Sequence, residues 1–326
     1  MMDEQYFLTG VRCKTFNHAP YIQETLSGFC MQETKFPFLC VIIDDKSTDG
    51  EQVVIGQYLE AHFDLDDNNI VLNEETDDYV LTFARHRTNR NCFFAVYYLK
   101  YNHYSIKKSK ESYFDRWLHQ SKYLAACEGD DYWICPQKLQ IQVDFLENHN
   151  DYSLCGTNGI IFWDNLTKAP SYFNTIIQDR TINIDEIINK WIFPTASLVY
   201  RKTIIQSYPS WTKKIFMGDQ TLILIASQLG KIYAMKNITC FYRKSIGNKD
   251  SVSSRLKEKE PGFIIQQLIL LLKEFDKWTN HKHQQLISTR IKYLQKKVSF
   301  LNAHHSCKYL AYMRYPIFSI KERMKH

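Results

Sequence analysis

The sequence predicts an α/β fold in which a mostly parallel central sheet is flanked by helices and followed by a C-terminal helical extension. Three observations support this prediction. Apolar runs alternate with segments of helical periodicity over the first half of the chain, one run is apolar almost without interruption, and two runs end in clustered acids. The 326 residues are enough to bury one large core and to add an appendage.

The first half of the chain alternates predicted strands and helices. Residues 7–15 (FLTGVRCKT) predict a strand, and residues 21–32 predict a helix with apolar side chains at helical spacing. Pro37 precedes a second strand, FLCVIIDD, whose apolar run is typical of a parallel strand covered on both faces. A loop of helix-capping residues leads to a helix over 51–61, and residues 69–72 predict a short third strand. Between there and the next clear strand the sequence predicts no element.

The stretch YLAACEGDDYW, from Tyr123 to Trp133, organises the rest of the prediction. A short apolar strand delivers Glu128, Asp130 and Asp131 to a glycine turn. Right-handed crossovers in a β-α-β-α-β unit bring this cluster to the same sheet edge as Asp44 and Asp45. A single acidic turn is usually solvated surface, but two acid clusters at one edge favour a site for Mg²⁺ or Mn²⁺, which prefer carboxylate oxygens.

Helical spacing returns in the second half of the chain. Pro136 marks the start of a predicted helix with Leu139, Val143 and Leu146 on one face. Two segments near the C-terminus, Phe263 to Trp278 and a second one from about Ile287 to Leu301, predict a helical pair packed on the α/β body.

Charge is distributed unevenly along the chain. The net charge is +6, yet residues 281–326 carry ten Lys or Arg and one acid, a balance of +9, so residues 1–280 carry −3. The tail CKYLAYMRYPIFSIKERMKH mixes cations with aromatic and aliphatic residues, which suits the surface of an anionic membrane. Because the tail lacks a recognisable nucleic-acid motif and the body is acidic, we expect no nucleic-acid partner.

Cysteine usage and the chain start favour a cytoplasmic protein. The nine cysteines have no paired spacing, so neither a disulfide framework nor a zinc knuckle is predicted. The start MMDEQYFLTGV lacks a basic segment followed by an apolar one, and Gln266 and Gln267 interrupt the longest apolar run. We therefore expect no signal peptide and no membrane span, with the tail as a peripheral contact to the inner membrane face. The scattered histidines are interpreted as surface or packing residues.

Three segments in order, KTFNHAPYIQETLSGFCMQ, VIIDDKSTDG and EGDDYWICPQKLQIQVDFL, resemble the inverting glycosyltransferases of family 2, of bacterial type, which have the GT-A fold. The resemblance covers about the first 245 residues and continues in WIFPTASLVYR and MGDQTLILIASQLG. It implies a catalytic domain over 1–250, with a nucleotide-sugar half at 1–133 and an acceptor half at 134–250, and a basic helical extension at 251–326. The implied role is cell-surface polysaccharide or glycolipid assembly.

The resemblance implies a role for each candidate residue on the donor side. Thr15, Asp44 and Asp45 would bind the base and ribose of a nucleotide diphosphate sugar, with a UDP-sugar as the favoured donor. Arg243, from a tyrosine-arginine pair after a strand, would contact the diphosphate. The acceptor would be a saccharide or a lipid-linked saccharide.

The resemblance also implies a metal and a base. Glu128 and Asp130 would hold Mn²⁺ or Mg²⁺, directly or through water, and Asp219 at the head of an apolar helix would be the general base. Asp219 is alternatively a plain helix cap, and Tyr132 and Trp133 are either core aromatics or sugar-stacking rings.

The sequence departs from the family pattern at two places. Glu128 stands where Asp is usual, and Lys244 and Ser245 follow Arg243 where many members carry a histidine near the metal. Two other functions remain open: a nucleotidyltransferase, although VRCKTFNHAP offers no glycine-rich, arginine-bearing phosphate loop, and a non-catalytic nucleotide-sugar-binding protein, although the acids at 130 and 219 are both retained.

Overall fold

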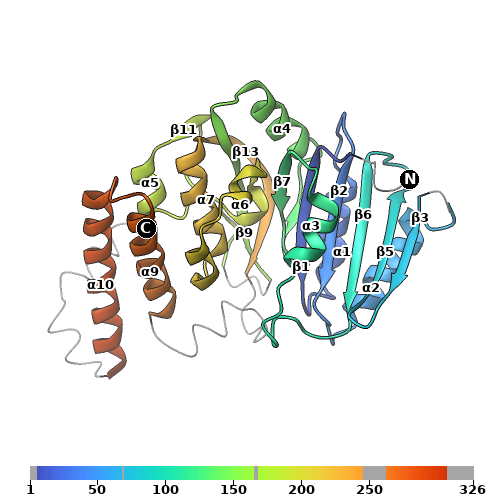
Figure 1. Ribbon diagram of the computed structural model, residues 1–326, viewed down its shortest axis with the longest axis horizontal. Helices are drawn as coiled ribbons and strands as arrows, with labels where there is room; N and C mark the ends of the chain where they lie inside the picture. Colours follow the sequence, from blue (N-terminus) through green and yellow to red (C-terminus); the bar gives the residue numbers. More distant parts are fainter. Residues whose placement is uncertain (1–5, 68–69, 165–167, 245–261, 307–326) are drawn as a thin grey trace. The chain divides into compact units, whose positions relative to one another are not determined.

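The computed structural model describes residues 6–67, 70–164, 168–244 and 262–306 (Figure 1). The chain divides into two compact units. The first comprises Met1–Asn183, Trp191–Ser207 and Ile225–Ile246, and the second comprises Ile184–Lys190, Tyr208–Leu224 and Gly247–His326.

The described strands form one mixed sheet, and all of them belong to the first unit. They are β1 (Thr9–Thr15), β2 (Phe38–Asp44), β3 (Phe63–Asp64), β4 (Leu72–Glu75), β5 (Tyr79–His86), β6 (Cys92–Leu99), β7 (Tyr123–Ala126), β8 (Tyr132–Trp133), β9 (Tyr152–Trp163), β10 (Ser171–Tyr172), β11 (Arg180–Ile182), β12 (Val199–Arg201) and β13 (Lys231–Lys244). The sheet order is β11-β13-β9-β12-β7-β1-β2-β6-β5-β3, with β10 beside β9, β4 beside β5 and β8 beside β13. The central strands β7, β1, β2 and β6 run parallel, which confirms the predicted fold class.

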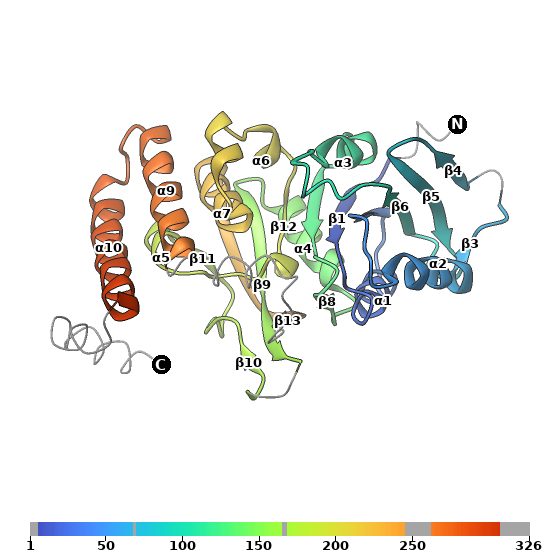
Figure 2. The ribbon, with the colours of Figure 1, turned by 90° about the horizontal axis from the view of Figure 1, so that it is seen from below.

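Helices cover both faces of the central strands (Figure 2). The described α-helices of the whole chain are α1 (Ile22–Cys30), α2 (Glu51–His62), α3 (Glu111–Leu118), α4 (Lys138–Asn148), α5 (Ile184–Asn189), α6 (Thr203–Gln206), α7 (Gly218–Leu229), α9 (Phe263–Trp278) and α10 (Gln284–Ser306), of which α5, α9 and α10 belong to the second unit. Figure 2 shows α3 on one face and α1, α2 and α4 on the other. Every residue of β2 is buried, as expected for a parallel strand covered on both sides.

Trp133 anchors the core between α1 and the acid-rich stretch that precedes it. Its side chain is 1% exposed, packs edge-on against Phe29 with 4.9 Å between ring centroids, and donates its Nε1–H to the carbonyl of Ala196 at 2.8 Å. A Cβ at Gly28 would lie 2.9 Å from the backbone nitrogen of Trp133, so only glycine lets α1 come this close. Trp133 is therefore a core aromatic. Lys138 lies over its ring at 4.7 Å, and burial lowers the pKa of this lysine to about 8.

The strand predicted over 69–72 is misplaced: residue 69 lies outside the described part of the chain, and of 70–72 only Leu72 lies in a strand. Residues 72–75 form β4, which pairs antiparallel with β5 away from the parallel centre. The strand that lies beside β2 is β6, and its sequence CFFAVYYL is as apolar as that of β2. The prediction missed β5, β6 and α3 because it stopped assigning elements after residue 72.

The second unit contains the helical pair that the sequence predicted. α9 and α10 contact each other, and Leu272, Phe275, Ile287 and Leu294, which lie at the predicted spacing, are buried. The basic residues 307–326 lie outside the described part of the chain.

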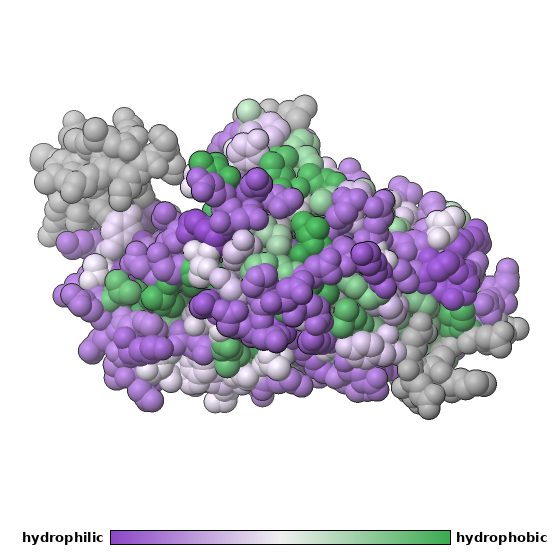
Figure 3. All heavy atoms as spheres, turned by 90° about the horizontal axis from the view of Figure 1, so that it is seen from above, coloured by the Kyte–Doolittle hydropathy of each residue, from purple (hydrophilic) through white to green (hydrophobic). Residues whose placement is uncertain are grey.

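The described surface is largely hydrophilic on the face seen in Figure 3, where apolar residues occur in small groups. Within residues 6–67, 70–164, 168–244 and 262–306, no helix has the length and hydrophobicity needed to span a bilayer.

Candidate functional site

Two acid-bearing strand ends meet at one edge of the sheet, as the sequence predicted. β1 lies between β2 and β7 and runs parallel to both, so that Thr15 pairs with Asp44 and Arg12 pairs with Ala126. Parallel strands end at a shared edge, where ligands of α/β proteins usually bind. Asp44 and the acidic loop, residues 128–131, therefore flank the end of β1.

The acidic loop is pressed against the end of β1 at Gly129. Its backbone N–H donates to the carbonyl of Lys14 at 3.1 Å, and the hydroxyl of Thr25 lies 3.0 Å from the carbonyl oxygen of Gly129. A Cβ at position 129 would lie 2.0 Å from Thr15 Oγ1. Only glycine fits here, so a steric contact with Thr15 sets the turn between Glu128 and Asp130.

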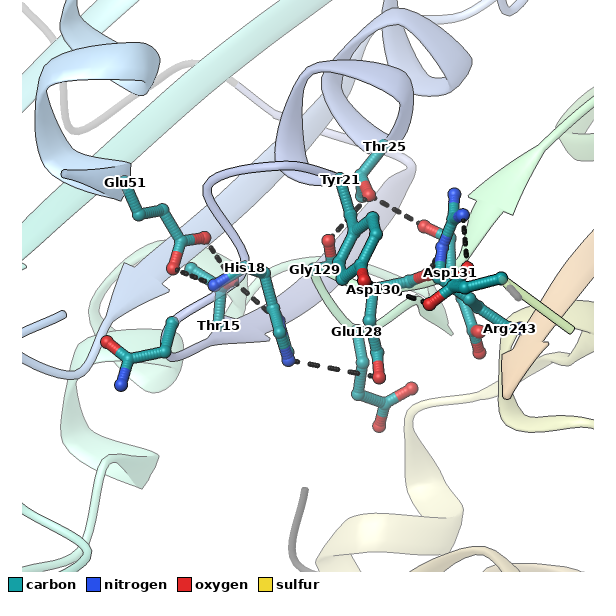
Figure 4. A network of polar contacts seen from close by, with 12 residues as sticks. Thr15, His18, Tyr21, Thr25, Glu51, Glu128, Gly129, Asp130, Asp131 and Arg243 are labelled. Atoms are coloured by element: carbon teal, nitrogen blue, oxygen red, sulfur yellow. Dashed lines mark hydrogen bonds and ion pairs between the residues drawn. The ribbon is translucent and has the colours of Figure 1, made fainter. Parts of the chain in front are cut away.

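Arg243, near the end of β13, also holds the acidic loop (Figure 4). Its backbone N–H donates to Asp131 Oδ1 at 2.8 Å, and its Nε donates to the carbonyl of Asp130 at 2.9 Å. Its Nη1 donates to Asp164 Oδ1 at 2.9 Å, and its Nη2 pairs with Glu24. Two carboxylates thus neutralise a guanidinium that is only 8% exposed, and the structure gives Arg243 a positioning role. Its predicted contact with a diphosphate stays a prediction.

The three acids of the loop differ in environment. Asp131 is buried, and this burial, together with nearby Asp130 and Glu128, raises the pKa of Asp131 well above its usual range. Asp130 and Glu128 are partly exposed. Asp131 is therefore a structural acid, while Glu128 and Asp130 are the two that reach solvent.

A buried carboxylate that the sequence analysis did not single out organises the end of β1. Glu51, the first residue of α2, accepts hydrogen bonds from the hydroxyl of Thr15, from the backbone N–H of His18 at 2.9 Å and from Ser47 Oγ at 2.8 Å. Burial raises the pKa of Glu51. In the sequence this residue has the pattern of an ordinary acid in the first turn of a helix, so no local signal marks its role.

His18 is the second residue that the sequence analysis missed. Its Nδ1 lies 3.1 Å from Thr15 Oγ1, and its Nε2 lies 3.8 Å from Asp130 Oδ2 (Figure 4). The side chain is 14% exposed and is directed at the acidic loop. The interpretation of His18 as a surface or packing residue did not include its place beside the acidic loop. In the sequence, the signal that could have marked His18 as a site residue is its position three residues after Thr15, the last residue of the first strand.

Asp45 holds a neighbouring loop at the same edge. Its Oδ1 accepts the backbone N–H of His103 at 2.7 Å, and its Oδ2 accepts that of Tyr104 at 3.1 Å and lies 2.7 Å from Lys110 Nζ. Asp45 is 5% exposed, so these contacts occupy most of its surface. The carboxylate therefore fixes the segment between β6 and α3.

Asp44 is buried beside Asp45, and only one of its two carboxylate oxygens accepts hydrogen bonds from the described residues. Burial raises the pKa of Asp44, and its Oδ1 accepts the backbone N–H of Ser47 at 3.1 Å. Its Oδ2 is buried and has no hydrogen-bond partner among the described residues. A buried acceptor without a donor is costly, and a ligand group could satisfy it.

Asp219 belongs to the second unit, in the first turn of α7, and is partly exposed. Its Oδ1 accepts the backbone N–H of Gln220 at 2.8 Å. A carboxylate at a helix N-terminus is stabilised by the exposed N–H groups there. Its predicted role as a base stays a prediction.

No group of three or more His, Cys, Asp or Glu side chains among the described residues is arranged to hold a metal ion on its own. Mg²⁺ and Mn²⁺ usually keep several waters and bind through one or two protein ligands together with substrate phosphates. Asp130 and Glu128, which reach solvent, and the adjacent imidazole of His18 fit such a shared site.

Comparison with known proteins adds to this geometry. No protein-family profile matches the chain. Uncharacterized proteins of Mycobacterium bovis and Mycobacterium tuberculosis are 27% identical to it over 235 residues, which is 71% of this chain and 57% of theirs. The chain thus spans little more than half the length of these relatives.

Two solved structures share its fold. TarS 1–349 of S. aureus matches with a TM-score of 0.54 at 15% identity, over 91% of this chain and 74% of that one. The mannosyltransferase PcManGT from Pyrobaculum calidifontis, solved with GDP-Man and Mn²⁺, matches with a TM-score of 0.51 at 10% identity, over 93% of this chain and 76% of that one. The chain therefore shares the fold of these two proteins, one of which is a mannosyltransferase.

Proposed function

We propose that this protein transfers a sugar from a nucleotide diphosphate sugar to an acceptor hydroxyl with inversion at the anomeric carbon. One observation carries the proposal. Thr15 and Arg243 hold the acidic loop at the carboxyl edge of the sheet, and its acids Glu128 and Asp130 reach solvent there. The chain shares its fold with a mannosyltransferase. The sequence motifs add the assignment to family 2 and a role in polysaccharide or glycolipid assembly.

The donor is proposed to lie at the end of β1. Asp44 supplies its unpaired Oδ2 to the base or ribose, Thr15 lines the same edge, and Asp45 fixes the adjoining segment that carries Tyr104 and Lys110. A UDP-sugar is the donor that the sequence motifs favour.

Glu128 and Asp130 are proposed to hold Mn²⁺ or Mg²⁺, and Arg243 to support the diphosphate end of the site. When bound, the cation supplies Lewis-acid stabilisation of the departing diphosphate. Asp131 and Arg243 keep the acidic loop in place while the charge on the leaving group grows.

Asp219 is proposed to be the general base. Its carboxylate takes the proton of the acceptor hydroxyl as that oxygen forms a bond to the anomeric carbon. The bond to the diphosphate breaks on the opposite side of the carbon, and the configuration is inverted. The diphosphate leaves with the bonding electron pair.

A saccharide acceptor is proposed to lie on the ends of β9, β10 and β13. The ammonium groups of Lys168 and Lys244 lie 4.6 and 5.4 Å from the ring centroid of Trp163. Phe173 packs edge-on against Tyr242, with 5.6 Å between the ring centroids. Aromatic rings bordered by polar groups suit sugar rings, which present apolar faces and polar edges. These residues belong to the proposed acceptor half, 134–250, whereas the donor residues belong to 1–133.

Donor hydrolysis tests the proposal directly. Purified protein incubated with Mn²⁺ and a panel of UDP-, GDP- and dTDP-sugars should release nucleoside diphosphate from one class of donor, as measured by mass spectrometry. If the protein neither binds nor hydrolyses any donor of the panel, the proposed glycosyltransferase activity is excluded.

The basic extension, 251–326, is proposed to hold the enzyme on an anionic membrane, where a lipid-linked acceptor would lie. Polybasic contact contributes about 1 kcal/mol for each engaged Lys or Arg. We expect the full chain to sediment with anionic liposomes at low salt and to be released at high salt, and a version ending at Asn302 to lose most of this binding. A full chain that stays in the supernatant at low salt would refute membrane contact.

A further inference from the structure

The orientation of His18 is fixed from two sides. Its backbone N–H donates to Glu51 Oε2 at 2.9 Å, and its ring nitrogen Nδ1 lies 3.1 Å from Thr15 Oγ1. The single proton of the Thr15 hydroxyl is donated to Glu51. The hydroxyl oxygen can therefore accept a hydrogen bond from Nδ1–H, and in the neutral ring this arrangement leaves the lone pair on Nε2.

This tautomer creates a pair of facing acceptors. The bare Nε2 of His18 lies 3.8 Å from the carboxylate oxygen Oδ2 of Asp130. Two lone pairs directed at one another repel unless a proton or a cation lies between them. Metal–ligand bonds of about 2.1 Å let two ligands of one ion lie up to roughly 4.2 Å apart, so a single ion can bridge this pair.

We propose that His18 Nε2 is a ligand of the divalent cation and binds it together with Asp130. This inference rests on the cation-dependent site proposed above, and it adds a ligand from the loop after β1. Thr15 and Glu51 are then positioning residues, because they orient the imidazole through Nδ1, as outer-shell partners of metal-binding histidines commonly do.

A nitrogen ligand also sets a preference between cations. Mg²⁺ takes oxygen ligands almost exclusively, whereas Mn²⁺ accepts imidazole as well as carboxylate. The site should therefore select Mn²⁺ over Mg²⁺. His18→Gln, which offers a carboxamide oxygen in place of the ring nitrogen, should reduce the affinity for Mn²⁺ by about tenfold or more and the affinity for Mg²⁺ by less.

Pulsed electron paramagnetic resonance of bound Mn²⁺ tests the assignment without relying on turnover. The full chain with Mn²⁺ and UDP should show coupling of the ion to ¹⁴N of an imidazole, and this coupling should disappear in His18→Gln. His119→Gln removes an exposed histidine outside the network and should keep it. Thermal unfolding of each variant checks that it is folded.

The outcomes separate the two proposals. Bound Mn²⁺ without ¹⁴N coupling in the parent protein overturns the role of His18 and leaves Asp130 and Glu128 as the ligands. This parent measurement decides the question even if His18→Gln does not fold. Persistent coupling in a folded His18→Gln also overturns it. A parent protein that binds no Mn²⁺ in the presence of UDP overturns the cation site as a whole.

Discussion

Asp130→Asn should abolish the effect of Mn²⁺ on donor binding while leaving the fold intact. The Asp130 side chain is 33% exposed, and its Oδ2 lies 3.8 Å from His18 Nε2, so the substitution removes a charge at an edge and no core contact. The backbone carbonyl that Arg243 holds is retained. Loss of a direct ligand should weaken cation binding by at least about a hundredfold, since even outer-shell changes commonly cost 10- to 100-fold.

Titration calorimetry with UDP, with and without Mn²⁺, measures this effect. The parent protein should bind UDP more tightly with Mn²⁺, and Asp130→Asn should bind it equally weakly in both conditions. Asp66→Asn removes an exposed carboxylate outside the site and should behave like the parent. Equal UDP affinity with and without Mn²⁺ in the parent itself would remove the cation from the proposed mechanism.

The central part of the fold could be predicted because its sequence signals are local and strong. β2 is buried at every residue, and its apolar run is visible without any knowledge of its partners. The order of strands and crossovers then placed Asp44 and Asp130 at one edge, since the topology of parallel units leaves little choice. The helices α9 and α10 were predicted from spacing alone, and buried residues lie at that spacing.

Most of the strands that the sequence analysis missed lack such local signals. β4 and β5 form an antiparallel pair, and the residues of β4 alternate between partly exposed and exposed. The stability of such a strand depends on its pairing partner, which the local sequence does not reveal. β6 is the exception, because its apolar run was as clear as that of β2 and should have been assigned.

The network behind the site could not be derived from sequence spacing. Glu51 contacts Thr15 across 36 positions of the chain, and Arg243 contacts Asp131 across 112. Such pairs arise only when distant strands are adjacent in the sheet. A prediction from motifs finds the clustered acids at the strand ends, but it does not find Glu51 and His18, whose contacts with Thr15 depend on the fold.

Asp219→Asn should reduce the turnover of sugar transfer by about a hundredfold or more, with donor affinity unchanged. The amide is nearly isosteric with the acid, and it retains an oxygen that can accept the N–H of Gln220, so the start of α7 should stay folded. What the substitution removes is a group able to take a proton. A stabilising charge at a helix terminus is worth only about 0.3–1 kcal/mol, so loss of stability would not explain a hundredfold effect in a folded enzyme.

Steady-state kinetics with an identified acceptor, together with calorimetry of UDP binding, tests this expectation. The pH profile gives a second readout, because the fall in rate toward low pH that a carboxylate base produces should be absent in the variant. Asp185→Asn is a matched control, since Asp185 also lies in the first turn of a helix of the same unit and has no proposed role in catalysis. If Asp219→Asn transfers sugar at nearly the parental rate, Asp219 only stabilises the helix terminus, and the base must be sought elsewhere in the chain.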